Sequence, residues 1–208
     1  MIRSSALLLT AVVFSAPPAF ASEAPEDAAA LLAKLGSTRG LEAKFREEKT
    51  IAGLKKPIVA EGTLYYRAPD RLARVVKTPV KQRVVLTPTE LVMQSRGKVQ
   101  RLPLESGSEL EALTGSMLSL FRGDLEALET HYSLKYARDG ASWTLELLPK
   151  SERLRHLIGG LRFEGEGERV ERFAVDEANG NRAVTEIEPI SLDRTFSKAE
   201  IRELFEVP

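Results

Sequence analysis

Few residues in this sequence have the type and spacing that catalysis or metal binding requires. His131 and His156 are the only histidines, and neither sits in a metal-ligand spacing. The sequence contains no cysteine, which excludes disulfides, thiolate nucleophiles and cysteine-based zinc sites. It also lacks a phosphate-binding glycine loop, a dinucleotide fingerprint and a nucleophile-elbow motif. We therefore expect a protein that is not an enzyme and that uses no cofactor or metal.

One carboxylate pair deserves comparison with glycosidase-type sites. Glu186 and Glu188 lie two positions apart, so on a strand they share one face. Such a pair is far more often the solvated side of a strand. Asp176, with Asn179 and Gly180 after it, has the composition of a hairpin turn.

Basic residues offer binding chemistry instead. Arg67, Arg71 and Arg74 are predicted to cluster around the turn at Pro69, where they would form a basic binding patch. The alternative is that they are exposed strand residues. Lys55 and Lys56 would form a second basic contact, or simply belong to a solvated loop.

Period-two alternation of apolar and polar residues dominates the chain and predicts strands with one dry face. In 41–46, for example, three apolar residues alternate with three charged ones. Short loops containing Pro, Gly, Asn or Asp separate the segments, so neighbours are expected to pair in an antiparallel meander. The expected strands, about ten, lie within 41–46, 58–67, 71–77, 81–87, 91–94, 98–102, 132–138, 143–148, 161–165, 169–176 and 181–190.

Helical spacing occurs at the start, in the middle and at the end of the chain. A short helix is predicted over 22–36. Ser108 and Glu111 form a capping-box pattern that opens a second helix, which Gly115 interrupts and Gly123 ends. Further short helices are predicted after Asp124, within 150–158, and after a second capping-box pattern formed by Ser197 and Glu200.

These elements indicate one domain of the α+β class. About ten twisted strands curl towards a barrel, so the sheet is expected to be a strongly curved, incomplete β-barrel. Helices inserted midway would lie across its concave side and enclose an apolar space. Burying one methylene group in such a space is favourable by about 0.8 kcal/mol of transfer free energy. For a sixteen-carbon chain this amounts to roughly 13 kcal/mol, from which the entropy lost on binding must be subtracted.

Candidate lining residues follow from the same alternation, with plain core packing as the alternative for each of them. The sheet's inner face is expected to carry Phe45, Leu64, Tyr66, Leu72, Val84, Trp143, Leu145 and Leu147. The helical lid is expected to carry Leu113, Met117, Leu120 and Phe121.

The N-terminal segment has the composition of a cleaved signal peptide. Arg3 precedes a short apolar run, and Ala19-Phe20-Ala21 has the small-x-small pattern of a cleavage site. Residues 1–21 are therefore predicted to be removed, which leaves a domain over 22–208. The chain has 30 basic and 30 acidic residues, a balance that argues against a nucleic-acid partner.

The segment 61–93 reads EGTLYYRAPDRLARVVKTPVKQRVVLTPTELVM, which contains a glycine–leucine–aromatic strand, a Pro turn and a proline–glutamine stretch. In these features the chain resembles the outer-membrane lipoprotein carrier (LolA-like) family of the Gram-negative periplasm. The segment 41–45 matches the family's first strand, and 205–208 resembles its C-terminal end. The resemblance extends loosely over 27–208.

The resemblance implies a monomeric periplasmic carrier that holds acylated lipoproteins under a helical lid. Its implied partners are an inner-membrane transporter and an outer-membrane acceptor. In such a carrier Arg67, Arg71 and Arg74 would contact a lipid head group or hold the lid. Lys55 and Lys56 would help to dock the transporter.

Two departures stand out. The family's arginine before the turn proline, which helps to hold the lid shut, is replaced here by Ala68. Two positions that are usually aromatic in the family are occupied by Leu72 and Arg74.

Other segments resemble a divergent branch of the family that is associated with lipid and aryl-polyene biosynthesis, so a non-lipoprotein lipid is a second expected cargo. These segments are 117–128, 143–149, Gly165 and 176–182. Two rivals from other classes are a periplasmic lipid-sensing regulatory domain and a purely structural envelope protein.

Overall fold

The structure is a computed structural model that describes residues 24–207. The predicted signal peptide and its cleavage site therefore lie outside the described residues. No helix in the described part of the chain is both long and apolar enough to cross a bilayer.

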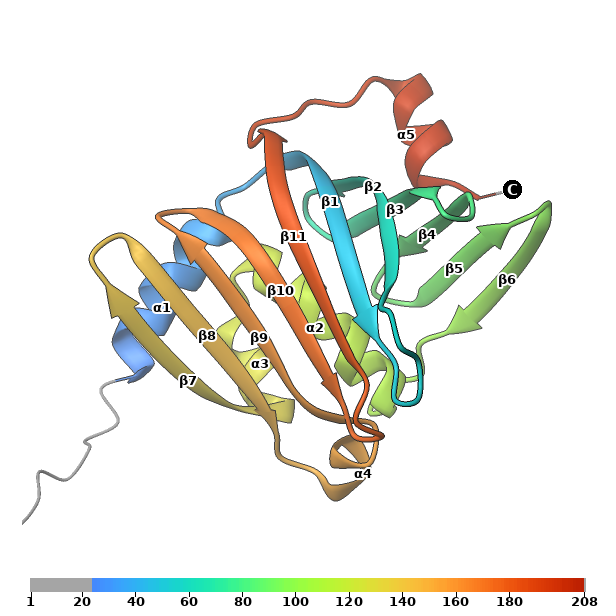
Figure 1. Cartoon of the computed structure of the whole chain (residues 1–208). Helices are drawn as coiled ribbons and strands as arrows, with labels where there is room; N and C mark the ends of the chain where they lie inside the picture. Colours follow the sequence, from blue (N-terminus) through green and yellow to red (C-terminus); the bar gives the residue numbers. More distant parts are fainter. Residues whose placement is uncertain (1–23, 208) are drawn as a thin grey trace, which may run out of the picture.

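A single antiparallel sheet of eleven strands forms the body of the protein, in the order β6-β5-β4-β3-β2-β1-β11-β10-β9-β8-β7. The sheet is strongly curved and does not close on itself (Figure 1). This confirms the predicted α+β class with an incomplete barrel. The strands are β1 (Gly40–Thr50), β2 (Ile58–Arg67), β3 (Arg71–Thr78), β4 (Gln82–Leu86), β5 (Glu90–Ser95), β6 (Lys98–Pro103), β7 (Tyr132–Asp139), β8 (Ser142–Pro149), β9 (Ile158–Glu166), β10 (Arg169–Glu177) and β11 (Arg182–Ser191).

Local sequence explains most of the sheet. In β8 the buried side chains of Trp143, Leu145 and Leu147 alternate with more exposed ones, as expected for a strand with one dry face. Gly140 has a φ of +59° in the tight turn between β7 and β8, a conformation that favours glycine. The two halves of the sheet meet where β1 pairs with β11, which joins the beginning and end of the strand sequence.

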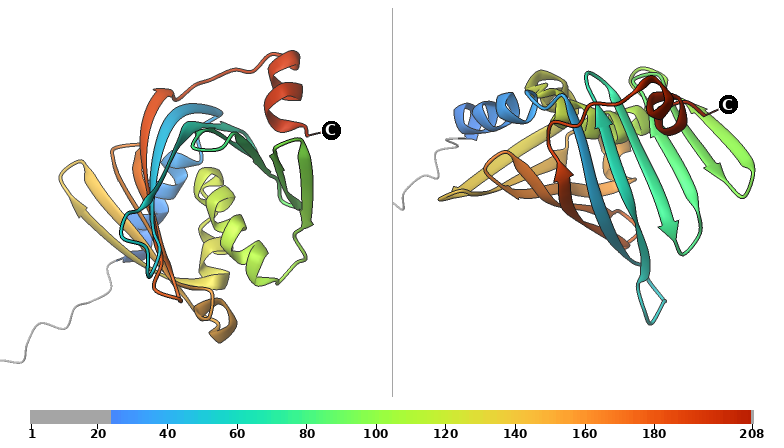
Figure 2. Two further views of the ribbon diagram at one scale, coloured as in Figure 1. Left: turned by 45° about the vertical axis from the view of Figure 1, so that its right-hand side comes forward. Right: turned by 90° about the horizontal axis from the view of Figure 1, so that it is seen from above.

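Five helices accompany the sheet: α1 (Ala24–Leu35), α2 (Glu109–Arg122), α3 (Leu125–His131), α4 (Glu152–Arg155) and α5 (Lys198–Phe205). Helices α2 and α3 lie inside the curve of the sheet (Figure 2). Helix α1 packs against α2 and β7, and α4 connects β8 to β9.

Helix α2 differs from its prediction in two details. The Ser108 side chain accepts a hydrogen bond from the Glu111 amide, but the Glu111 carboxylate lies 3.8 Å from His131 Nε2 instead of capping Ser108 in return. Only half of the predicted capping box is therefore formed. Gly115 does not interrupt the helix, which runs to its left-handed cap at Gly123, because packing on both sides outweighs the propensity cost of one glycine.

Helix α5 lies on the opposite, convex face of the sheet. Its Phe205 and the following Val207 pack against Ala73, Val85 and Val92 of β3, β4 and β5. Ser197 and Glu200 form the complete capping box that the sequence predicts. This helix covers part of the outer face and takes no part in the concave surface.

Candidate functional site

Strand register places all eight predicted inner-face residues on one face of the sheet. Tyr66 lies opposite Leu72 across β2 and β3, and Leu145 lies opposite Phe163 across β8 and β9. Phe45 lies opposite Ile187 where the two halves meet. This is the face that packs against α2 and α3, and it is called the concave face below.

The predicted residues of the concave face are apolar and largely buried. Of the eight predicted residues, all except Val84 are at most 8% exposed, and Val84 is partly buried. Burial alone fits both a ligand-binding surface and a core. The role of these residues in binding therefore remains a proposal.

Helix α2 supplies the cover, and its four predicted lid residues divide between the two halves of the sheet. Leu120 packs in the core cluster formed with β7, β8 and β9, whereas Phe121 packs in the cluster formed with β1 to β4. Leu113 and Met117 are only partly buried, and Met117 contacts both clusters. The flexible thioether of Met117 thus lies at the junction of the two clusters.

Two buried tyrosines connect α2 to the sheet. Tyr132 Oη donates a hydrogen bond of 3.1 Å to the Ala112 carbonyl. Tyr66 Oη lies 3.0 Å from the Pro69 carbonyl and 3.4 Å from the Phe121 carbonyl, and its ring stacks on Phe121 with centroids 4.8 Å apart. The lid thus closes on this sheet with Ala68 in place of the family's arginine.

Burial changes the ionisation of both tyrosines. Desolvation raises the pKa of Tyr132 to about 12, partly offset by a hydrogen bond with Ser116. Desolvation likewise raises the pKa of Tyr66 above its ordinary value. Both phenols remain neutral, and able to donate, well above physiological pH.

The pockets that adjoin the helices are small. One beside Leu41, Phe121 and Ile187 holds about 20 Å³, and one between α1 and β8, beside Leu31 and Trp143, holds about 50 Å³. A third, between α2 and α3, holds about 180 Å³. Ligand pockets for organic molecules usually hold roughly 300 to 1,000 Å³. Side chains of the helices therefore occupy much of the expected apolar space, and an acyl chain that bound there would displace α2.

A larger groove of about 670 Å³ lies on the convex face of β1, β2 and β11. Its lining combines apolar side chains with charged ones, among them Lys44, Arg46, Glu61 and Glu188, and burying these charges under an acyl chain would be costly. Glu186 and Glu188 are exposed on this face, with Glu188 3.7 Å from Lys44, which fits the solvated-strand alternative for this pair.

The predicted cluster of Arg67, Arg71 and Arg74 forms only in part, and the prediction is wrong for Arg74. Arg67 and Arg71 pair across the β2–β3 hairpin on the convex face, whereas Arg74 lies opposite Leu64 on the concave face. The reason is the period of the strand: positions 71 and 74 differ by an odd number, so their side chains point to opposite faces.

Arg74 forms a polar group at the uncovered part of the concave face. Its guanidinium lies 4.4 Å from the centre of the Phe45 ring, and its Nη2 atom is 3.0 Å from Glu47 Oε1. That Nη2 atom is nevertheless buried without a hydrogen bond of good geometry among the described residues. On the neighbouring strand β11, the Thr185 hydroxyl donates a hydrogen bond of 3.2 Å to Glu47 Oε2.

Sequence reasoning did not single out three residues that the structure makes central: Tyr132, Ile187 and Glu47. Ile187 contacts three of the core clusters at the β1–β11 junction. The available signal for Tyr132 was a phenol at the start of a strand directly after an amphipathic helix. No sequence signal marked Glu47 or Ile187, because their contacts are with strands that are distant in sequence.

Among the described residues each histidine has one carboxylate nearby. His131 Nε2 lies 3.8 Å from Glu111, and His156 Nε2, at the C-cap of α4, lies 4.0 Å from Glu152. No group of three potential metal ligands occurs among residues 24–207.

The sequence pattern described as "Outer membrane lipoprotein carrier protein LolA-like" matches residues 20–187. A search of curated proteins found no match.

Three solved structures are among those that align with this chain. A LolA superfamily protein from Nitrosomonas europaea aligns with a TM-score of 0.47 and 10% identity, over 84% of this chain and 96% of that chain. A DUF1329 family protein from Desulfovibrio piger aligns with a TM-score of 0.48 and 12% identity, over 86% and 95%. The MucA/MucB complex of Pseudomonas aeruginosa aligns with a TM-score of 0.44 and 12% identity, over 84% of this chain and 62% of that chain.

Proposed function

The chain belongs to the LolA-like family of outer membrane lipoprotein carrier proteins, and from this premise we propose that it is a periplasmic carrier of acylated cargo. Residues 22–208 form the carrier after removal of a signal peptide. The protein acts as a monomer, catalyses no reaction, and shuttles the acyl chains of lipoproteins or related lipids from an inner-membrane transporter to an outer-membrane acceptor.

One observation carries this proposal: the apolar side chains of the concave face are covered by helices, chiefly α2 with contributions from α1 and α3, and few hydrogen bonds connect α2 to the sheet. In the proposed carrier, α2 swings away and acyl chains take the place of Leu113, Met117, Leu120 and Phe121 against the sheet. Exchanging one apolar partner for another keeps the sheet face dry in both states. The tyrosine bonds to Ala112 and Phe121 are the polar contacts that break.

Arg74 is the proposed head-group contact. Its Nη2 atom is a buried donor without a well-oriented acceptor, which an ester, amide or phosphate oxygen of the cargo would satisfy. Its neighbours Phe45 and Val84 would then contact the first methylenes of the chain.

Native mass spectrometry tests the proposal directly. Residues 22–208, purified from the periplasm without detergent, are expected to carry an acylated species at about one per protein. The mass of that species distinguishes a lipoprotein from an aryl-polyene or other lipid. An empty protein that also fails to take up a fluorescent fatty acid would contradict the carrier function and favour the sensor or structural alternatives.

Two valine variants test the site. Val84→Gln places an amide on the concave face, while Val75→Gln makes the same change at a partly buried position of the opposite face. Uptake of the fluorescent fatty acid should fall in the first variant and stay unchanged in the second. Equal uptake by both variants would place the ligand elsewhere.

A further inference from the structure

Charge is distributed very unevenly along this electrically balanced chain. The segment 71–103, which contains β3 to β6, has eight basic residues and a single acidic residue, Glu90. The rest of the chain therefore has 22 basic and 29 acidic residues out of the 30 of each kind. One wing of the sheet is strongly basic and the remainder is acidic.

Three of the connections between β1 and β6 share the same kinds of residue. In an antiparallel meander the β1–β2, β3–β4 and β5–β6 connections lie at the same end of the strands, and they follow one another along one rim (Figure 2, right). Each has two cations, no carboxylate and at least one exposed aliphatic side chain. The segments are 51–58 (IAGLKKPI), 77–81 (KTPVK) and 96–99 (RGKV).

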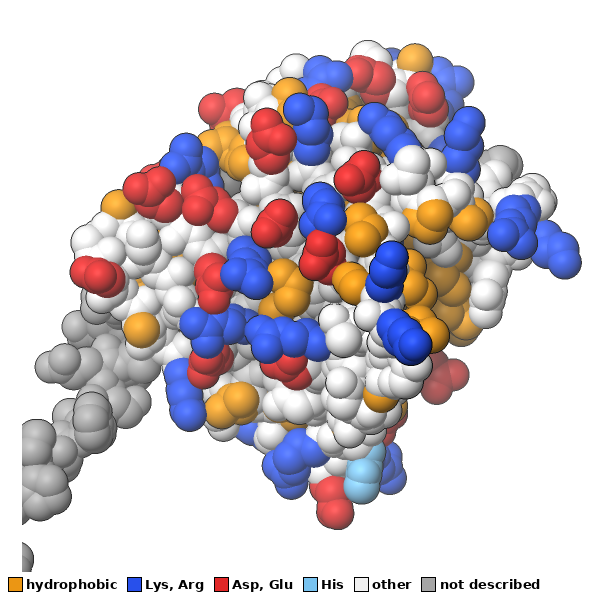
Figure 3. Space-filling model, viewed as in Figure 1, with side chains coloured by type: hydrophobic (Ala, Val, Ile, Leu, Met, Phe, Trp, Pro, Cys, Tyr) orange, Lys and Arg blue, Asp and Glu red, His pale blue; other side chains and the backbone are white. Residues whose placement is uncertain are grey.

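The exposed aliphatic residues are concentrated on this rim. The described chain has seven large hydrophobic side chains classed as exposed, and four of them belong to the three connections. Leu54 is 53% exposed and Val99 is 40% exposed. Figure 3 shows hydrophobic side chains gathered next to Lys and Arg on the right-hand part of the visible face. The four rim residues are Leu54, Ile58, Val80 and Val99.

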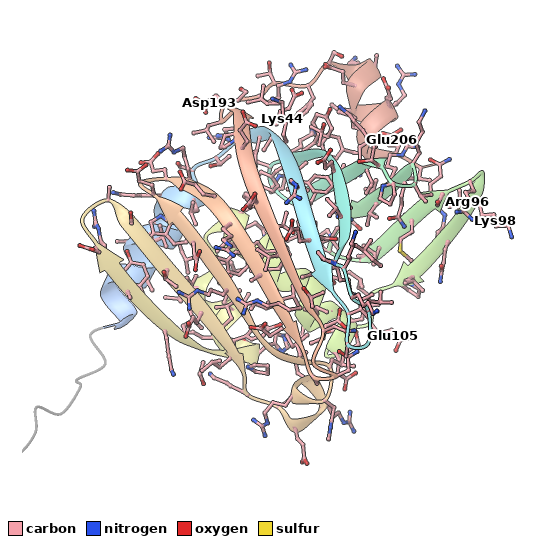
Figure 4. The ribbon with its side chains drawn as sticks, viewed as in Figure 1. Lys44, Arg96, Lys98, Glu105, Asp193 and Glu206 are labelled. Carbon is pink, nitrogen blue, oxygen red and sulfur yellow. The ribbon has the colours of Figure 1, made fainter. Side chains whose placement is uncertain are left out.

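The rim cations are available to a partner. Arg96 and Lys98 extend from the tip of the β5–β6 hairpin into solvent (Figure 4). None of the six makes an ion pair with any of the residues described, whereas Arg74 and Arg101 of the same wing face Glu47 and Glu90. The six are Lys55, Lys56, Lys77, Lys81, Arg96 and Lys98.

A pocket of about 440 Å³ lies between the second and third connections. Lys77, Lys81, Arg83 and Arg96 contribute to its lining, which includes no carboxylate. Arg83 donates to Gln94 Oε1 at 2.7 Å and to the Glu203 carbonyl, but its Nε atom is buried without a hydrogen-bond partner among the described residues. This pocket presents several donors to an anion.

From these observations we propose that the rim formed by 51–58, 77–81 and 96–99 docks the protein onto an anionic phospholipid bilayer. The aliphatic side chains enter the headgroup boundary, and the six cations contact lipid phosphates, as in other peripheral membrane surfaces. The aliphatic residues sit on three separate projecting turns. A bilayer meets such turns together, whereas a folded acidic protein would need a matching recess for each. Docking does not require the proposed cargo, so either proposal can fail without the other.

Vesicle binding tests the docking surface. The protein is titrated with vesicles of phosphatidylcholine alone and of phosphatidylcholine with phosphatidylglycerol, at low salt and at about 0.5 M salt, where charges are screened within a few ångströms. We expect binding to the anionic vesicles only, and its loss at high salt. Failure to bind the anionic vesicles at low salt would overturn the proposal. That result would also be expected if the cations bind an acidic protein and not a bilayer.

Matched variants locate the contact. Lys77→Glu with Lys81→Glu should weaken binding by at least about 30-fold, since each cation near an anionic surface contributes about a factor of five. Lys34→Glu with Lys198→Glu causes the same change in net charge away from the rim and should weaken binding much less. Equal losses in both double variants would show a net-charge effect and contradict the assigned surface.

A second pair of double variants tests how much the exposed aliphatic side chains contribute to vesicle binding. Val80→Ser with Val99→Ser should weaken binding several-fold, whereas Ile190→Ser with Leu192→Ser, which are exposed elsewhere on the molecule, should have no effect. Fatty-acid uptake in solution should be unchanged in all of these variants. Rim variants that bind vesicles as the unmodified protein does would overturn the proposal.

Discussion

At the scale of single residues, the hydrogen bonds that connect α2 to the sheet are few. Tyr132 Oη bonds the Ala112 carbonyl near the start of the helix, and Tyr66 contacts the Phe121 carbonyl near its end. A neutral hydrogen bond contributes about 1 kcal/mol net. Each bond can therefore bias the position of the helix without fixing it.

Tyr132→Phe removes one of these bonds and keeps the ring. If α2 must leave for cargo to bind, a loss of about 1 kcal/mol from the closed state should increase the apparent affinity for a fluorescent fatty acid roughly fivefold. Tyr65→Phe, on the convex face beside Phe196, is the control and should leave the affinity unchanged. Weaker binding by Tyr132→Phe would show that the phenol contacts the cargo instead of restraining the helix.

Alkaline pH should loosen the same contact. Because the pKa of Tyr132 is raised to about 12 in the folded protein, the unfolded chain loses this proton first. The stabilisation is thus complete below about pH 10 and is lost as the pH rises towards 12. Urea unfolding from pH 8 to pH 12 should show a decline in stability that is smaller in Tyr132→Phe. Identical pH profiles would argue against a buried neutral phenol.

At the scale of elements, the C-terminal end of α2 is fixed by its close approach to α1. Gly123 has a φ of +69°, and a Cβ atom there would lie 2.4 Å from the Leu32 carbonyl oxygen. Gly36 at the end of α1 is equally close to the Arg122 carbonyl, at 2.6 Å. The two helix ends therefore cross with backbone against backbone, and we propose this crossing as the point about which α2 would turn if it opens.

Two glycine variants separate the strain of a positive φ from this close packing. Gly140 has a φ of +59° with no neighbour within 4 Å of its virtual Cβ, so Gly140→Ala should cost only about 1 kcal/mol of unfolding free energy. Gly123→Ala adds a backbone clash and should cost at least about 3 kcal/mol. Urea unfolding measures both, and equal losses would mean that α1 and α2 are not packed this closely.

Element prediction from sequence succeeded where a local rule decides the outcome. The alternation in 143–147 placed three side chains on the dry face of β8, and the capping box at Ser197 formed as expected. It failed where a tertiary contact competes with the local rule. The Glu111 carboxylate is drawn to His131 of α3, and Gly115 stays helical because both flanks of α2 are packed.

At the scale of the whole molecule, two apolar clusters share one sheet and are connected by Met117 of α2 and Ile187 of β11. Displacing α2 would expose parts of both clusters together. Bound cargo should therefore stabilise the entire sheet and not one half of it.

A long-chain acyl ligand at a free concentration 100 times its Kd should add about 2.7 kcal/mol of stability. For a domain of this size that corresponds to an increase in Tm of about 5–10 °C, measured as one cooperative transition. A four-carbon acid, which buries few methylenes, is the control and should give no increase. The absence of a shift with the long chain would contradict the carrier function.

The sequence by itself determined which side chains share a face, where most turns fall and how the helices begin and end, because each depends on residues only a few positions apart. All eight predicted inner-face residues therefore fall on one face. Only the tertiary structure decided that β1 pairs with β11, that Arg74 lies beside Glu47, and that α2 packs against the concave face. These features join segments as distant as Phe45 and Ile187, and local patterning contains no information about which distant strands will meet or how closely a helix will pack between them.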